Sequence, residues 1–61
     1  MKIILKEIRE KRGMSVKELS EKSGVSRQLI YRIEGGAETT LSTLEKLAKP
    51  LNVSIRNIFL P

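Results

Sequence analysis

Hydrophobic residues recur at helical spacing along most of this chain, in short stretches that are separated by turn-forming residues. In the first stretch, Ile4, Leu5 and Ile8 lie on one side of a helix predicted over residues 1–12. No Ser, Thr, Asp or Asn stands at its start as an N-cap. Residues 2–4 are therefore either part of this helix or extended, as in a short strand.

Residues 15–36 have the pattern of two short helices joined by a tight turn. Ser15 is a predicted N-cap, and Glu18 three residues later completes a capping box. Gly24 interrupts the pattern and is expected to adopt a positive φ, which costs glycine little. Ser26 is the predicted N-cap of the second helix, which a pair of glycines ends.

The second of these helices has two different faces. At about 100° per residue, Ile30 and Ile33 point toward the core, and Leu29 lies at the rim of that face. The opposite face carries two arginines, a glutamine and a tyrosine: Arg27, Gln28, Tyr31 and Arg32.

The clearest apolar stripe follows a predicted N-cap at Thr40. We expect the core to cover all of it; its members are Leu41, Leu44, Leu47, Ala48 and Leu51. Pro50 lies inside this stripe and has no N–H to donate to the Lys46 carbonyl. The helix is therefore expected to end or kink near Lys49.

The end of the chain completes an all-α prediction. Asn52 suits a left-handed residue after the helix, and Ser54 is expected to cap a last short helix over residues 55–59. Together these elements predict a single domain, residues 1–61, built as a compact bundle of about five short helices.

That bundle leaves apolar side chains over at its end. Five short helices do not hide all of Ile55, Ile58, Phe59 and Leu60. We therefore predict a homodimer with a two-fold contact through the last helix and tail, which residues 1–4 join.

Composition narrows the function. The chain has 61 residues, no Cys and no His, which removes disulfides, the usual zinc ligands and the commonest catalytic base. We find no nucleophile–base set, metal cluster or phosphate-binding glycine loop, so we predict no enzyme activity, no metal, no cofactor and no small-molecule ligand. Twelve basic and seven acidic residues give a net charge of +5, which favours a polyanionic partner. No apolar run approaches the roughly 18 residues of a membrane span, and a cytoplasmic protein is expected.

The turn and its flanks resemble the Xre family, the Cro and phage-repressor type of helix-turn-helix. The matching pattern is ELxxxxGVSxxxIxxIExG, carried here by Glu18-Leu19, Gly24-Val25-Ser26, Ile30, Ile33-Glu34 and Gly36. Segments before and after it, KEIREKRGMS and TLSTLEKLAKPLNVSIRNIF, resemble the family's other helices. The resemblance implies a repressor-like fold and DNA binding.

By the same resemblance, Arg27, Gln28 and Arg32 match positions that read DNA bases. Arg presents paired donors that suit guanine, and Gln presents a donor and an acceptor that suit adenine. The alternative is that the three form an ordinary solvated helix face. Against it, no acidic residue interrupts this face before Glu34.

A second set of residues is expected to hold the DNA backbone. Helix starts present free N–H groups and a partial positive charge, which suit phosphates. The expected contacts at helix starts are Ser15, Val16, Lys17, Ser26, Thr39, Thr40 and Ser42. Tyr31, on the outer face of the second helix, is expected to contact the backbone; the alternatives are a thymine methyl or a neighbouring side chain. Val16 is apolar, so only its backbone N–H can contact a phosphate. For Ser15 the alternative is that it acts only as the N-cap of its helix. Glu38 in the adjoining loop would repel phosphates, so either its side chain points away or the loop lies farther from DNA.

The resemblance also implies a partly buried ion pair between Arg9 and Glu34. Arg9 borders the apolar side of the first helix, and Glu34 ends the second helix of the motif. The alternative is two solvated charges. The pair would orient the two helices more than it would add net stability.

Two classes of function remain. The leading one is a transcriptional regulator that binds double-stranded DNA sequence-specifically, with residues 27–34 in the major groove and two half-sites about one helical turn apart. The other is an antitoxin-like or adaptor protein that uses the same fold mainly to bind a protein partner.

Overall fold

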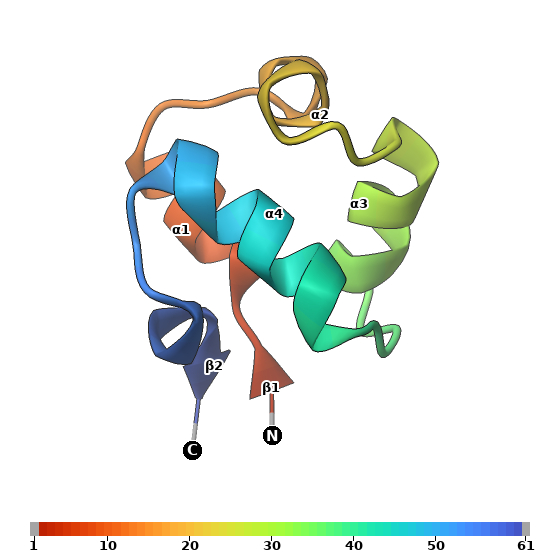
Figure 1. The fold of residues 1–61 in the computed structure, drawn as a ribbon, viewed down its shortest axis with the longest axis vertical. Coiled ribbons are helices and arrows are strands. Elements are labelled where there is room, and N and C mark those ends of the chain that lie inside the picture. Colours follow the sequence, from red (N-terminus) through yellow and green to blue (C-terminus); the bar gives the residue numbers. More distant parts are fainter. Residues whose placement is uncertain (1, 61) are drawn as a thin grey trace.

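The computed structural model describes residues 2–60 of the chain, most of them in helices (Figure 1). In chain order the elements are β1 (Lys2–Ile3), α1 (Leu5–Lys11), α2 (Val16–Ser23), α3 (Arg27–Glu34), α4 (Leu41–Leu51), the 3-10 helix η1 (Ile55–Ile58) and β2 (Phe59–Leu60). Helix α4 crosses the middle of the molecule, and α2 and α3 lie beyond one side of it (Figure 1). In these described residues, no helix is long and apolar enough to cross a membrane.

One hydrophobic core holds the elements together. It collects side chains from every helix: Leu5, Val16, Leu19, Val25, Ile30, Ile33, Leu44, Leu47, Ala48, Leu51 and Ile58. Complete burial of one Leu or Ile side chain contributes about 1.5–3 kcal/mol. Since α4 supplies four of these residues and packs against both α2 and η1, it is the central element of the fold.

Hydroxyl side chains cap the N-termini of three helices, as predicted. The Glu18 N–H donates to Ser15 Oγ over 3.0 Å, and the Leu29 N–H donates to Ser26 Oγ over 3.2 Å. Thr40 caps α4 in the same way. The expected return contact from the Glu18 carboxylate is replaced by an ion pair, because Glu18 Oε2 lies 3.2 Å from Lys22 Nζ one turn later.

Gly24 ends α2 in the left-handed conformation that the sequence predicted, with φ of 77°. An alanine Cβ there would meet no heavy atom of a non-neighbouring residue within 4 Å, so backbone strain alone would act. We expect Gly24→Ala to lower the free energy of unfolding by about 1 kcal/mol, and Gly24→Asn by less, because Asn tolerates this conformation. Urea denaturation of the three proteins measures the effect. An unchanged midpoint in Gly24→Ala would contradict the prediction.

The N-terminal segment takes the extended alternative. Helix α1 starts at Leu5, and the strand β1 before it pairs antiparallel with β2, with Lys2 opposite Leu60 and Ile3 opposite Phe59. The Ile4 N–H continues this pairing with a 2.7 Å bond to the Ile58 carbonyl. The two ends of the chain are thus joined at one side of the molecule (Figure 1). Met1 lies outside the described residues.

Helix α4 ends two residues beyond Lys49, near which it was predicted to end or kink. The helix runs through Pro50 to Leu51, and Asn52 follows with the expected left-handed φ of 57°. Pro50 removes a single amide near the end of the helix, whereas Leu51 is almost completely buried. Backbone amides after the helix also bond the carbonyls of its last turn, from Asn52 to Lys49 and from Val53 to Ala48.

The sequence also predicted a fifth helix in the bundle, and the structure has no α-helix there. Residues 55–58 form a single 3-10 turn, the Ser54 side chain makes no capping bond, and Phe59 belongs to β2. Too few residues remain for an α-helix once β1 has paired with this segment. The described residues therefore form four α-helices, one 3-10 turn and a two-stranded ladder, in place of five α-helices.

Two apolar side chains lie where the sequence did not predict them. Ile58 was expected on the surface, but it is completely buried, because the 3-10 turn points it into the core. Leu41 was expected in the core, but 63% of it is exposed. As the first residue of α4, Leu41 lies at the edge of the bundle, beyond the residues that cover the rest of the stripe.

Candidate nucleic-acid interface

Two serine side chains fix the turn between α2 and α3. Ser20 Oγ donates to the Val25 carbonyl over 2.6 Å, and Ser23 Oγ accepts from the Val25 N–H over 3.1 Å. Val25 itself is buried in the core. These bonds set the angle at which α3 leaves α2. The sequence analysis missed them, although a Ser in the last turn of a helix before a Gly is a signal for such bonds.

Helix α3 has a buried back and an open front. Ile30 and Ile33 have no exposed surface, and Leu29 is half-buried beside them. The front carries the four residues singled out from the sequence, all of them exposed: Arg27, Gln28, Tyr31 and Arg32. At 100° per residue, Gln28 points most directly away from the core, with Tyr31 and Arg32 on either side of it. These side chains are free to reach a partner outside the protein.

One guanidinium ties α3 to the rest of the domain. Arg9 Nε lies 2.7 Å from Glu34 Oε2, and a second guanidinium nitrogen donates to Glu34 Oε1 over 3.1 Å. A third donates to the Met14 carbonyl over 2.9 Å, in the loop before α2. Arg9 therefore joins α1, the start of α2 and the end of α3 at one point. The Met14 contact was not foreseen, because no sequence pattern indicates a backbone acceptor.

This ion pair also sets the charge of the interface. The side chains of Arg9 and Glu34 are only 11% and 8% exposed, so the Glu34 carboxylate is neutralised inside the domain. The hydrogen bond from Arg9 to Glu34 raises the pKa of Arg9 above its ordinary value, and the guanidinium stays charged at any physiological pH. The front of α3 thus presents basic and neutral groups only.

The start of α2 offers backbone donors. The Glu18 N–H donates to Ser15 Oγ, and the Leu19 N–H donates to the Ser15 carbonyl. By helix geometry the amides of Val16 and Lys17 remain directed outward. Val16 is only 8% exposed, so its side chain belongs to the core and its amide alone is available. Lys17 is exposed beside it.

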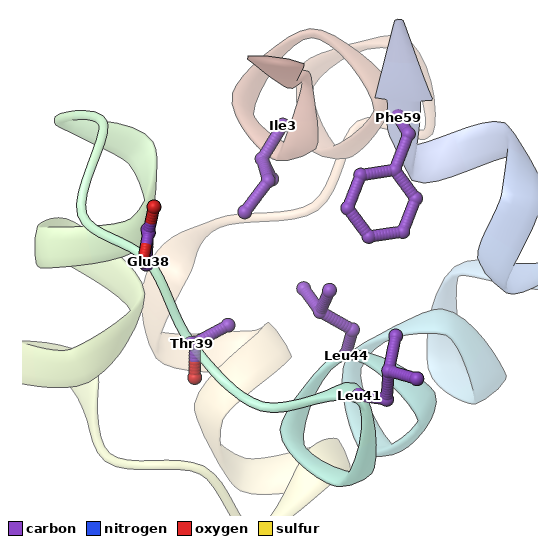
Figure 2. A pocket seen from close by; sticks show the side chains of 6 residues that line it. All are labelled: Ile3, Glu38, Thr39, Leu41, Leu44 and Phe59. Carbon is purple, nitrogen blue, oxygen red and sulfur yellow. The ribbon is translucent and has the colours of Figure 1, made fainter. Parts of the chain in front are cut away.

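The remaining backbone-contact candidates lie at the starts of α3 and α4. Ser26 is exposed at the first, and Thr40 and Ser42 are exposed at the second. Thr39 is half-buried and turns toward a pocket that Glu38 also lines (Figure 2). The structure thus assigns Glu38 to the border of that pocket.

Comparisons with known proteins agree with this geometry. Residues 5–58 match the family model HTH_3, described as helix-turn-helix. The chain is 38% identical over 58 residues to the HTH-type transcriptional regulator SutR of Escherichia coli, across 93% of this chain and 33% of that protein. It therefore spans about a third of the length of this curated relative.

Two crystal structures have closely similar folds. An HTH_3 family transcriptional regulator from Vibrio cholerae superposes with a TM-score of 0.84 at 36% identity, over 90% of this chain and 32% of that one. The restriction-modification controller protein C.AhdI from Aeromonas hydrophila gives a TM-score of 0.83 at 32% identity, over 90% of this chain and 85% of that one.

Proposed function

The chain belongs to the helix-turn-helix family HTH_3, and from this premise we propose that it is a transcriptional regulator that binds double-stranded DNA sequence-specifically through α3 in the major groove. One observation carries the proposal. The front of α3 exposes Arg27, Gln28 and Arg32 on a helix whose back is buried, and its single acid, Glu34, is bound to Arg9.

In this proposal the front of α3 reads bases. Gln28 and Arg32 are four residues apart, so their Cα atoms are separated by about 6 Å along the helix axis. That distance is close to two base-pair steps, which allows the two side chains to read base pairs about two steps apart from one helix. Arg27, in the first turn, extends the reading by one further position. Arg suits guanine and Gln suits adenine.

The helix starts hold the phosphates. The hydroxyl oxygens of Ser15 and Ser26 accept capping bonds, so their O–H groups stay free to donate to a phosphate oxygen. Further donors in this proposal are the amides of Val16 and Lys17, the Lys17 ammonium and the Tyr31 hydroxyl. Thr39, Thr40 and Ser42 extend this contact toward α4.

The domain, residues 1–61, acts as one DNA-binding unit and pairs with a second copy on a two-fold DNA site. A recognition helix of eight residues reads only a few base pairs, which is little for a selective regulator. Two copies with half-sites one helical turn apart would double the sequence that is read. Both similar regulators and the controller protein bear names that describe regulation.

Titration of labelled DNA at several salt concentrations tests the proposal. The logarithm of the affinity should fall linearly with the logarithm of salt concentration, with a slope of about −0.9 for each phosphate contacted. A duplex selected from a random pool should resist a scrambled competitor. If both duplexes compete equally, the protein binds DNA only through non-specific charge attraction and does not read sequence. If no binding occurs at low salt, the proposed DNA binding is refuted.

A further inference from the structure

Tyr31 is a large side chain that the fold leaves uncovered. Among the described residues, the exposed large hydrophobic side chains are Tyr31, at 60%, and Leu41, at 63%. Leu41 belongs to α4, whereas Tyr31 stands on the front of α3, among the residues that we propose to read DNA bases. With more than half of its surface in water, the Tyr31 ring is not packed beneath a neighbouring side chain. Its exposure is therefore better explained by a contact outside the protein.

Helical geometry places Tyr31 between two kinds of proposed DNA contact. At 100° per residue, Tyr31 lies on the flank of α3 between Gln28, which points most directly away from the core, and Glu34. Glu34 is bound to Arg9, and Arg9 also donates to the Met14 carbonyl just before α2. This flank of α3 therefore faces the start of α2, where the proposed phosphate contacts lie. Tyr31 thus lies at the border between the base-reading front and the phosphate-holding helix start.

A pyrimidine methyl group occupies the corresponding border in DNA. The C5-methyl group of thymine projects into the major groove, on the edge of the base that is nearest to the backbone of its own strand. It makes no hydrogen bond, so apolar contact is what recognises it. Of the four residues on the front of α3, Tyr31 is the one with an aromatic ring. The same side chain ends in a hydroxyl that can donate to a phosphate oxygen.

We propose that Tyr31 is a specificity-determining residue that recognises the C5-methyl group of a pyrimidine in the major groove. The ring packs against the methyl group, and the hydroxyl donates to a phosphate oxygen of the same strand. Thymine carries this methyl group in unmodified DNA, and 5-methylcytosine carries it at the same place. A site with cytosine at this position is therefore bound more tightly once the cytosine is methylated. The inference rests on the proposed function, because it assigns one base position within the site that α3 reads.

Contact through the hydroxyl alone is the competing explanation. A phosphate needs only a small donor, such as the hydroxyl of Ser15 or the ammonium group of Lys17, and it would leave the Tyr31 ring in water. Packing of the ring on a methyl group removes apolar surface of both partners from water, which is favourable. The two explanations differ in the variant Tyr31→Phe, which keeps the ring and loses the hydroxyl.

Uracil replacement tests the methyl contact, because uracil differs from thymine only in lacking the C5-methyl group. Each thymine of a duplex selected from a random pool is replaced in turn. Wild-type protein should lose about fourfold in affinity at one thymine of each half-site, the change that corresponds to burial of one methyl group. Tyr31→Ala should bind the thymine and uracil duplexes equally. Leu41→Ala, which removes the other exposed apolar side chain, is the control and should discriminate like the wild type.

Tyr31→Phe separates the ring from the hydroxyl. This variant should keep the fourfold preference for thymine over uracil. It should also bind all sequences roughly two- to tenfold more weakly, because one neutral hydrogen bond to the backbone is lost. The salt slope should stay unchanged, since a hydroxyl releases no counterion from the phosphate. Loss of the thymine preference in Tyr31→Phe would contradict the packing of the ring on the methyl group.

Methylated cytosine provides the second arm of the test. At the thymine that responds to uracil, the T·A pair is replaced by C·G and by 5-methyl-C·G. Wild-type protein should bind the methylated duplex about fourfold more tightly than the unmethylated one, and Tyr31→Ala should bind both equally. Equal binding by the wild type would mean that the position requires thymine as a whole and would overturn recognition of the methyl group.

Further outcomes decide between this inference and the proposed function. Equal affinity of the wild type for thymine and uracil at every position, a methyl dependence that persists in Tyr31→Ala, or a selected site without thymine would overturn the inference. Sequence-selective binding without any methyl dependence would refute the inference alone. An absence of binding to any duplex at low salt would refute the proposed function and the inference with it.

Discussion

Arg9→Ala is expected to lower the free energy of unfolding by about 1–3 kcal/mol, because it would leave the Glu34 carboxylate without its partner at a partly buried site. The side chains of Arg9 and Glu34 are 11% and 8% exposed, and the Arg9 guanidinium also donates a hydrogen bond to the Met14 carbonyl. At about 0.05–0.15 kcal/mol per residue, a domain of 61 residues has roughly 3–9 kcal/mol of stability in total, so the variant should lose a large part of it. Urea denaturation followed by circular dichroism measures the loss.

The chain supplies a matched control for this prediction. The Glu18–Lys22 pair is also an ion pair, but it is a single 3.2 Å contact within one helix, and its side chains are 45% and 55% exposed. Lys22→Ala should therefore cost at most about 0.5 kcal/mol. The double replacement Arg9→Met with Glu34→Leu should recover most of the stability lost in Arg9→Ala, since no charge stays buried. Equal losses in Arg9→Ala and Lys22→Ala would mean that the Arg9–Glu34 pair contributes no more than a surface pair.

Arg32→Ala is expected to weaken binding to the preferred DNA site by about 1–3 kcal/mol and to relax selectivity at one base position. Gln28→Ala should behave in the same way at a different base. Lys17→Ala should instead weaken binding to all sequences alike and reduce the salt slope by about one unit. Competition assays against a panel of duplexes that differ at single positions distinguish the two patterns.

The stability of these variants provides the control. Arg32, Gln28 and Lys17 are exposed, so their replacement should change the free energy of unfolding by about 0.5 kcal/mol or less. If Arg32→Ala lowers specific and unspecific binding equally, Arg32 contacts a phosphate and the assignment of the α3 front is wrong. If it lowers neither, α3 does not enter the groove.

The local features of the helix-turn-helix were predictable from the sequence. Ser15, Ser26 and Thr40 cap their helices through hydrogen bonds that span three residues, and the left-handed turn at Gly24 depends on the lack of a side chain. These interactions are complete within one turn of chain, so neighbouring residue types suffice to predict them. The resemblance to the Xre family is confirmed by the family match over residues 5–58.

The faces of α3 were predictable for a similar reason. Helical spacing alone separates Ile30 and Ile33 from Gln28 and Arg32, and the structure has the first pair buried and the second exposed. The role of each exposed side chain toward DNA remains a prediction, which the experiments above address.

The ends of the chain were decided by tertiary structure. Residues 55–59 have a spacing that is compatible with an α-helix, but pairing of Phe59 and Leu60 with β1 limits the helical part to a 3-10 turn over residues 55–58. Similarly, the burial of Leu51 keeps α4 helical past Pro50, against the local preference of proline. In both places a contact between residues distant in sequence outweighs a local preference of about 3 kcal/mol or less.

Leu41 shows where helical periodicity in the sequence stops predicting burial and tertiary packing decides it. Its spacing with Leu44 and Leu47 predicts that it lies on the apolar side of α4, and it does border a pocket that Ile3 and Phe59 also line. Helical periodicity gives a direction around the helix axis, but it says nothing of how far the neighbouring elements extend along that axis. The sequence by itself thus determined helices α1 to α4, the caps at Ser15, Ser26 and Thr40 and the inward face of α3. Tertiary structure decided that Leu41 stays uncovered, because β1 and β2 leave a pocket between their side chains and the start of α4.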